Sequence, residues 1–206
     1  MKPMDNPIQA VIFDFGNVLV NWDIHRIFGR FFPTPAAVDS FLAETRYTEW
    51  NARLDAGAPF AQEVARVAEQ FPQYAQAIHA YHTDWRKGVA SPIHGSVELL
   101  QRLKQAGYPL YIFSNFSAET FIQMRANYPW VALFDDVVLS GEIHLVKPDP
   151  AYFHVGLHRI GHPAHECLFI DDSLPNIETA HKLGLPSIHF QSPDQLEREL
   201  KTLQIL

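Results

Sequence analysis

The sequence has 206 residues, of which 47% are hydrophobic, an ordinary fraction for a globular protein with a sizeable core. Its net charge of -7 and the lack of any lysine- or arginine-rich run argue against a nucleic-acid-binding protein. One cysteine, Cys167, excludes an intramolecular disulfide and suits a reducing compartment. The N-terminal residues MKPMDNPIQ lack the apolar centre of a signal peptide, and no apolar stretch approaches membrane-spanning length. We therefore expect a cytoplasmic protein without a membrane segment.

The first element along the chain is the stretch QAVIFDFGNVLV, residues 9–20. Its apolar residues 10–13 are typical of a buried parallel strand. Asp14 ends this run, and Gly16-Asn17 indicate a tight turn. Open α/β sheets place their chemistry at the C-terminal ends of such strands. A lone aspartate here is more often a turn residue, so the functional interpretation depends on the rest of the chain.

The next segment, residues 21–87, has helical periodicity and no convincing strand. We expect four or five helices, around residues 24–32, 38–42, 50–54, 64–68 and 75–85. The aromatic residues of this segment are expected to be mostly core, with one or two near a substrate pocket. This pattern predicts an all-α domain, residues 21–87, inserted between two parts of another domain, residues 1–20 and 88–206.

From residue 91 the expected strands (109–113, 137–139, 167–170 and 187–190) alternate with helices (96–106, 117–127, 149–161, 174–183 and one from 194). A turn at residues 141–142 leads towards 143–146. Such alternation predicts a Rossmann-like α/β fold, a parallel sheet with helices on both faces. The 100 residues between Asp14 and Ser114 far exceed a strand–helix–strand crossover. We therefore expect the helical insertion to cover the C-terminal edge of the sheet as a lid.

Four polar clusters follow the expected strands. They are Asp14, Ser114-Asn115, Lys147-Pro148-Asp149 and Asp171-Asp172. Phosphoryl transfer can use a carboxylate as nucleophile, and a hydroxyl and an ammonium group as donors to the phosphate oxygens. Magnesium prefers carboxylate and carbonyl oxygens, which Asp14, Asp172 and the backbone near Gly16 offer. The clusters together predict a phosphoryl-transfer site.

The same clusters resemble the motifs of the haloacid dehalogenase-like (HAD) superfamily. FDFGNVL resembles its nucleophile motif, IFSN its Ser/Thr motif, VKPDP its lysine motif and FIDDSLPNI its acidic metal motif. The helical insertion also lies where that superfamily has an α-helical cap. Within the superfamily, FDFGNVLVNWDIHR is similar to bacterial sugar phosphatases of the α-glucose-1-phosphate type.

This resemblance implies a role for each matching residue. Asp14 would be the nucleophile, Ser114 and Asn115 would bind the phosphoryl group, and Lys147 would balance the negative charge. The implied cofactor is Mg²⁺, and the residues implied to hold it are Asp14, Gly16, Asp172 and Asp171. Of the two adjacent acids Asp172 would be the direct ligand, whereas Asp171 would be a ligand or its partner. Asn176 would support the site.

One position departs from the superfamily's pattern. Its phosphatases usually carry a second aspartate two residues after the nucleophile, which protonates the leaving alcohol and then activates water. Here this position is Gly16. Asp23 and His25 are candidate replacements, although a surface charge and a helix-start histidine explain them at least as well. A sugar 1-phosphate would depend least on this acid, because an anomeric hydroxyl is a more acidic leaving group.

The favoured function is a magnesium-dependent phosphatase of a small phosphorylated metabolite, with a sugar phosphate as the favoured substrate. A 2-haloacid dehalogenase is an alternative, since halide needs no proton, but the adjacent acids Asp171 and Asp172 disfavour it. A catalytically weakened phosphate-binding or scaffold protein is a third interpretation. The histidines at 154, 158, 162 and 165 are more simply solvated side chains than a zinc site. Either a monomer or a homodimer is compatible with the sequence.

Overall fold

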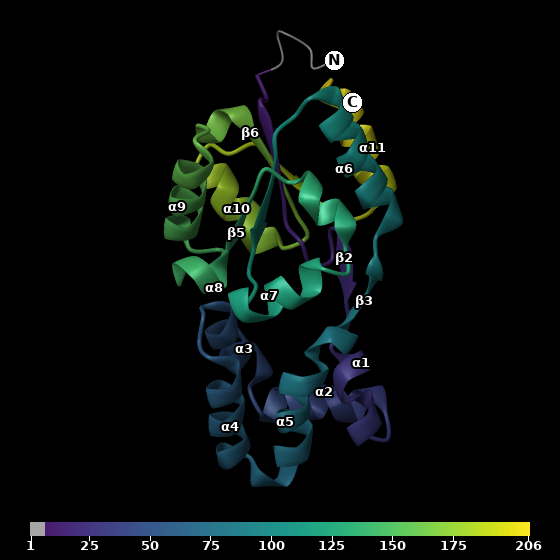
Figure 1. Cartoon of the computed structure of the whole chain (residues 1–206), viewed down its shortest axis with the longest axis vertical. Helices are drawn as coiled ribbons and strands as arrows, with labels where there is room; N and C mark the ends of the chain where they lie inside the picture. The colour runs from purple at the N-terminus through teal and green to yellow at the C-terminus, as the bar shows by residue number, and fades with distance from the viewer. Residues whose placement is uncertain (1–6) are drawn as a thin grey trace.

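The structure, a computed structural model, describes residues 7–206. Within these residues five parallel strands form one sheet in the order β5-β4-β1-β6-β7 (Figure 1). The strands are β1 (Ala10–Phe13), β4 (Leu110–Ser114), β5 (Asp136–Leu139), β6 (Cys167–Asp171) and β7 (Ser187–His189). A parallel sheet with helices around it confirms the predicted Rossmann-like α/β fold.

Helices cover both faces of this sheet, which is why its central strand is apolar throughout. The helices after the insertion are α6 (His94–Ala106), α7 (Ala118–Arg125), α8 (Ser140–Ile143), α9 (Pro150–Ile160), α10 (Leu174–Lys182) and α11 (Pro193–Thr202). In β1, Val11 and Phe13 pack in the cluster that includes α6 and α11. Ala10 and Ile12 pack in the cluster that includes α9 and α10.

The strand order places a topological switch point at β1. The chain builds β4 and β5 on one side of β1 and then crosses to build β6 and β7 on the other. Val11 pairs with Leu110 of β4 and with Leu168 of β6, so the three strands are in register. The C-terminal ends of β1, β4 and β6 therefore meet at one edge, where open α/β sheets bind ligands.

The helices of residues 21–87, which we call the cap, gather beyond this edge (Figure 1). They are α1 (His25–Phe28), α2 (Pro35–Glu44), α3 (Tyr47–Asp55), α4 (Phe60–Gln70) and α5 (Ala75–Asp84). Aromatic rings form their interior, where Phe28 stacks on Tyr81 with centroids 5.7 Å apart. The two-domain division at these bounds stays a prediction.

Two local expectations were wrong. Residues 21–22 belong to a strand, β2 (Val20–Trp22), which pairs antiparallel with β3 (Val89–Pro92) where the chain enters and leaves the cap. Strands of three and four residues carry too little periodicity to be recognised. The segment after β5 forms the short helix α8, whose first residue, Ser140, is fully buried against the cap.

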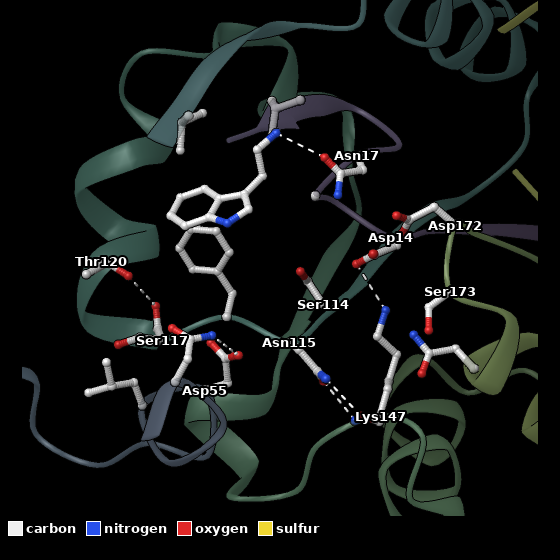
Figure 2. A pocket seen from close by; sticks show the side chains of 18 of the residues that line it. Asp14, Asn17, Asp55, Ser114, Asn115, Ser117, Thr120, Lys147, Asp172 and Ser173 are labelled. Carbon is white, nitrogen blue, oxygen red and sulfur yellow. Dashed lines mark hydrogen bonds and ion pairs between the residues drawn. The ribbon is translucent and has the colours of Figure 1, made fainter. Parts of the chain in front are cut away.

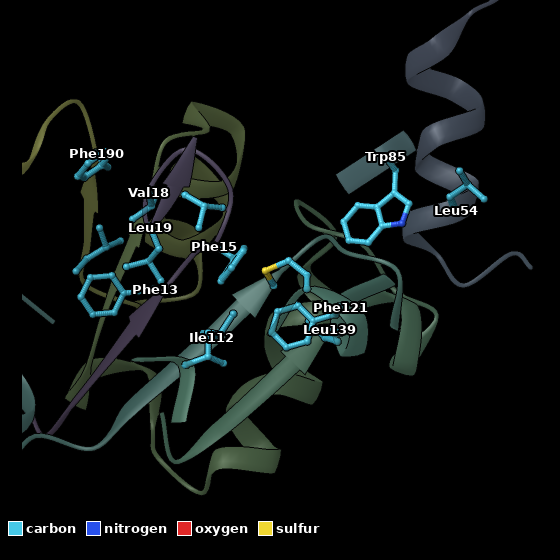
Figure 3. Packing of buried hydrophobic residues seen from close by; sticks show 14 of the residues in the cluster. Phe13, Phe15, Val18, Leu19, Leu54, Trp85, Ile112, Phe121, Leu139 and Phe190 are labelled. Carbon is cyan, nitrogen blue, oxygen red and sulfur yellow. The ribbon is translucent and has the colours of Figure 1, made fainter. Parts of the chain in front are cut away.

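Hydrophobic packing is continuous from the sheet into the cap. Phe15, directly after Asp14, packs edge-on against Phe121, with centroids 5.6 Å apart (Figure 3). It also packs edge-on against Phe116, with centroids 6.1 Å apart. Trp85, at the end of the cap, in turn packs edge-on against Phe116 at 5.9 Å. The cap thus rests on the residues that flank the predicted nucleophile.

Candidate active site

Lys147 lies at the centre of the polar groups below the cap. Its Nζ is 3.0 Å from Asp14 Oδ1 and 2.6 Å from Asp171 Oδ2, and it donates to the Phe113 carbonyl at 2.8 Å. The side chain is only 1% exposed. Burial acts to lower the pKa of Lys147, yet the charges of Asp14 and Asp171 raise it above its usual value. The ammonium group therefore stays charged and holds the two carboxylates together.

Asp171, the last residue of β6, is fully buried, and both of its oxygens are engaged. Oδ1 accepts from the Ser173 backbone N–H at 2.8 Å, and Asn176 Nδ2 lies 3.0 Å from both oxygens. Oδ2 also pairs with Lys147. These contacts favour Asp171 as a residue that positions Lys147, with Asn176 as its support.

Asn115 is joined to Lys147 by two hydrogen bonds. Its Nδ2 donates to the Lys147 carbonyl and its Oδ1 accepts from the Lys147 N–H, each at 2.8 Å. Both side-chain groups are thus used within the protein. A role for Asn115 in holding Lys147 explains this geometry better than phosphate binding through its side chain.

Three carboxylates at this edge fit a divalent cation. One oxygen from each of Asp14, Asp171 and Asp172 lies within 4.8 Å of the others, the only such group of three or more acids, histidines or cysteines in residues 7–206. Burial raises the pKa of Asp14 to about 7, with Asp171 contributing after the opposing charge of Lys147. Burial, and then Asp171, also raises the pKa of Asp172. A hard cation with oxygen ligands would relieve this repulsion, which makes Mg²⁺ a chemically suitable occupant.

A cavity of about 520 Å³ lies between this edge and the cap (Figure 2). The predicted residues that line it are Asp14, Gly16, Ser114, Asn115, Lys147, Asp172 and Asn176. The cap and its connections contribute an aromatic wall of Trp22, Phe60, Tyr81 and Trp85, and one carboxylate, Asp55. Trp50, in contrast, is buried inside the cap. The cavity therefore has a charged end at the sheet and a mostly aromatic end at the cap.

The two candidate replacements for the missing acid lie outside this cavity. Asp23 Oδ1 accepts from the His25 backbone N–H at 2.9 Å, and His25 begins α1 and pairs with Asp39 on the cap surface. Neither belongs to the residues that line the cavity. They act as helix-start and surface residues.

Sequence reasoning missed two residues that the structure places at the site. Asn17 has a left-handed backbone (φ 54°), and its side chain hydrogen-bonds to Asp172 and accepts from the Trp22 N–H at 3.0 Å. The Gly16-Asn17 turn was the only signal for it. Asp55, from the C-terminal end of α3, lines the cavity. No local pattern distinguishes it from other cap acids, because only the docking of the cap brings it there.

Comparison with known families agrees with this geometry. The family description "haloacid dehalogenase-like hydrolase" matches residues 8–184, which include β1, the cap and the strand ends of β4 and β6. The protein belongs to this HAD-like hydrolase family. The predicted family resemblance is therefore confirmed. None of the helices in residues 7–206 is long and apolar enough to span a membrane.

Two relatives come from fungi. The chain is 27% identical to the drimenol cyclase drtB of Aspergillus calidoustus over 200 residues, covering 95% of this chain and 36% of drtB. It is 32% identical to the sesquiterpene phosphatase astK of Aspergillus oryzae over 117 residues, covering 56% of this chain and 59% of astK. The chain thus spans only about a third to three fifths of their lengths.

A solved HAD-family structure from Bacteroides thetaiotaomicron has the same fold. This enzyme, bt-2542, in complex with magnesium and inorganic phosphate, superimposes with a TM-score of 0.73 at 23% identity. The match covers 90% of this chain and 95% of that chain. At this identity the likeness supports the fold of the HAD-like chain rather than its substrate.

Proposed function

We propose that this HAD-like hydrolase is a magnesium-dependent phosphatase that acts on a small phosphomonoester through an aspartyl-phosphate on Asp14. The observation that carries the proposal is the buried contact of 3.0 Å between Asp14 and Lys147 at the charged end of the cavity. A carboxylate held this way faces the space where a phosphate would lie, beside Ser114 and Asp172 (Figure 2). The magnesium complex of a structural neighbour supports the cofactor.

In the first step an oxygen of Asp14 forms a bond to phosphorus while the bond to the leaving oxygen breaks. Lys147 stabilises the phosphoryl oxygens by its charge, and the Ser114 hydroxyl donates a hydrogen bond to one of them. In the second step water attacks phosphorus and releases Asp14 and inorganic phosphate. Mg²⁺, held by Asp14, Asp172 and the Gly16 backbone with Asp171 behind them, would offset the repulsion between the nucleophile and the substrate.

The aromatic residues that line the cavity indicate which alcohols it could hold as the leaving group. Aromatic rings such as Trp22 and Trp85 can pack against the apolar face of a sugar, which is compatible with the sugar phosphate favoured by the sequence. They equally suit an apolar alcohol. An apolar phosphate ester is therefore a second candidate substrate, supported by the similarity to a sesquiterpene phosphatase. The phosphate-binding end would be the same for both.

The test is phosphate release from a panel of sugar 1-phosphates, sugar 6-phosphates, nucleotides and prenyl phosphates, with Mg²⁺ or with EDTA. We expect release that depends on Mg²⁺, with a preference for sugar 1-phosphates or prenyl phosphates. No release from any ester would contradict the proposal. Halide release from a 2-haloacid would then identify a dehalogenase, and its absence would favour a phosphate-binding scaffold. A cytoplasmic location and a monomeric or homodimeric state stay predictions.

A further inference from the structure

The space beside Asp14 lacks the acid that HAD phosphatases usually place there. The residue at that position is Gly16, which lines the cavity, and a Cβ added to it would meet no atom within 4 Å. Packing therefore does not require glycine here. The leaving oxygen is open to a proton donor from another part of the protein, and the opposite wall of the cavity belongs to the cap.

Asp55 is the carboxylate that the cap places on that wall. In Figure 2 it comes from the cap side, Asp14 comes from the sheet side, and Ser114 lies between them in this view. Two hydrogen bonds fix the turn that carries Asp55 on the core. Ser140 Oγ donates to the Asp55 carbonyl at 2.5 Å, and His144 Nδ1 lies 2.9 Å from the Ala56 carbonyl.

The turn also fits too closely against the core for a larger residue. Gly57, with φ +95°, has no room for a side chain, because an added Cβ would lie 2.6 Å from His144 Nδ1 and 2.8 Å from the Gly141 carbonyl. Ser140 Oγ additionally accepts from the Phe116 N–H at 2.9 Å, in the loop that follows Ser114. One buried hydroxyl thus ties the Asp55 turn to the predicted phosphate-binding loop.

A chain of hydrogen bonds within the cap orients the Asp55 carboxyl group. Tyr81 OH donates to Asn51 Oδ1 at 2.7 Å, and Asn51 Nδ2 donates to Asp55 Oδ2 at 3.0 Å. Because Asn51 donates to Oδ2, a proton on the carboxyl group belongs on Oδ1. Burial, followed by the charge of Asp14, raises the pKa of Asp55 to about 8, so the group carries that proton at neutral pH.

We propose that Asp55 is the general acid and base of this site, supplied by the cap in place of the acid that is missing at Gly16. The proposal rests on the phosphatase function proposed above. In the first step the electron pair of the broken P–O bond goes to the leaving oxygen, which takes the proton from Asp55 Oδ1. In the second step the Asp55 carboxylate takes a proton from the attacking water, the bond between phosphorus and Asp14 breaks, and the acid is restored.

The titratable groups facing Asp55 come from both the core and the cap. Asp14 lies on the sheet side, Tyr47 and Tyr81 belong to the cap interior, and His144 follows α8 beneath the turn. Both tyrosines have their pKa raised by burial, with the charge of Asp55 adding to the shift. Neither tyrosine competes with Asp55 as a proton donor near neutral pH.

The test compares two esters with rings of similar size. p-Nitrophenyl phosphate releases a phenolate that needs no proton, whereas benzyl phosphate releases an alkoxide that leaves poorly without one. For Asp55→Asn we expect kcat/KM for benzyl phosphate to fall about 100-fold or more. We expect kcat/KM for p-nitrophenyl phosphate to stay within about threefold. Because the second step also loses its base, p-nitrophenol should appear as a burst before a slow steady state.

The control variant is Asp39→Asn, which removes an exposed cap carboxylate and should leave both esters unchanged. If Asp55→Asn lowers both kcat/KM values, Asp55→Glu should restore the benzyl ester preferentially. Equal losses in both variants, or a wild-type enzyme active only on p-nitrophenyl phosphate, would overturn the role of Asp55. A wild-type enzyme inactive on all esters would instead overturn the phosphatase function, and the role of Asp55 would fall with it.

Discussion

The two walls of the cavity are built in different ways. On the sheet wall, polar side chains such as Lys147, Asp171 and Asn115 are each held by two or more hydrogen bonds or ion pairs. On the cap wall, rings such as Trp22 and Trp85 are joined by one oriented carboxyl group, Asp55. In the proposed function, the rigid polar wall would bind the phosphoryl group that all phosphomonoesters share, while the cap wall would contact the alcohol, which differs between substrates.

The largest expected effect is on the sheet wall, at the nucleophile. Asp14→Asn should lower kcat by about 10⁴-fold or more, because an amide cannot form the phosphoryl-enzyme bond. The fold should persist, because asparagine has the same shape as aspartate and the substitution removes a negative charge that repels Asp171. Phosphate release and the thermal midpoint measure the two effects. A fully active variant would contradict the whole assignment, and Asp39→Asn again serves as the matched control.

Removal of the Lys147 side chain should lower stability as well as activity, because Lys147 pairs with the carboxylates of Asp14 and Asp171. Lys147→Ala leaves Asp171 buried without its ion-pair partner, and we expect a loss of about 3–5 kcal/mol in the free energy of unfolding. Urea denaturation measures this loss. Lys87→Ala, which removes an exposed partner of Asp84, should cost about 1 kcal/mol or less. Similar losses for both variants would show that the sheet wall is not the rigid element described.

The contact between the two walls can be weakened separately. Ser140→Ala removes the hydroxyl that bonds to the Phe116 N–H and to the Asp55 carbonyl, and should destabilise the protein by about 1–3 kcal/mol. The exposed Ser40→Ala should change stability by less than about 0.5 kcal/mol. If Ser140→Ala raises KM but leaves stability unchanged, the contact would contribute to substrate binding and not to the stability of the fold.

The last expected effect is a pH dependence of stability that comes from the cap wall. The pKa of Asp55 is about 8 in the folded protein and about 3.9 when unfolded, so its stabilising contribution is complete below about pH 4. This contribution is lost as the pH rises through 8. A pKa difference of about four corresponds to about 5–6 kcal/mol. Relative to Asp55→Asn in EDTA, the thermal midpoint of the wild type should therefore fall by about 10–20 °C from pH 4 to pH 9. Parallel profiles would show that Asp55 titrates normally.

The sheet and its polar edge were predictable because their signals are local. The apolar run of β1 ends at Asp14, and Asp171 likewise ends β6, so one strand pattern gives both the fold and its functional end. Lys147 was predicted from its place between an expected strand and the helix start at Asp149-Pro150, but the segment before it forms the short helix α8. The structure explains its position through Asn115, whose two bonds to the Lys147 backbone have no local signature.

The cap wall was not predictable, because the contacts that define it are not local in the sequence. Asp55 is one of several cap acids, and its environment comes from contacts with Ser140 and His144, which lie about 85 residues further along the chain. Helical periodicity reports which side of a helix is buried and not which partner buries it. The ribbon of β2 and β3 was missed because its two strands are separated by the entire cap.

That ribbon has a mechanical consequence. The two chain crossings between core and cap, at Val20–Trp22 and Val89–Pro92, are hydrogen-bonded to each other as one antiparallel pair. Two unpaired connecting segments would allow the cap to move relative to the core in several directions. A hydrogen-bonded ribbon favours rotation of the cap about a single hinge axis. In the role proposed for Asp55, any opening and closing of the cap about this ribbon would return the Asp55 carboxyl group to the same side of the cavity, opposite Asp14.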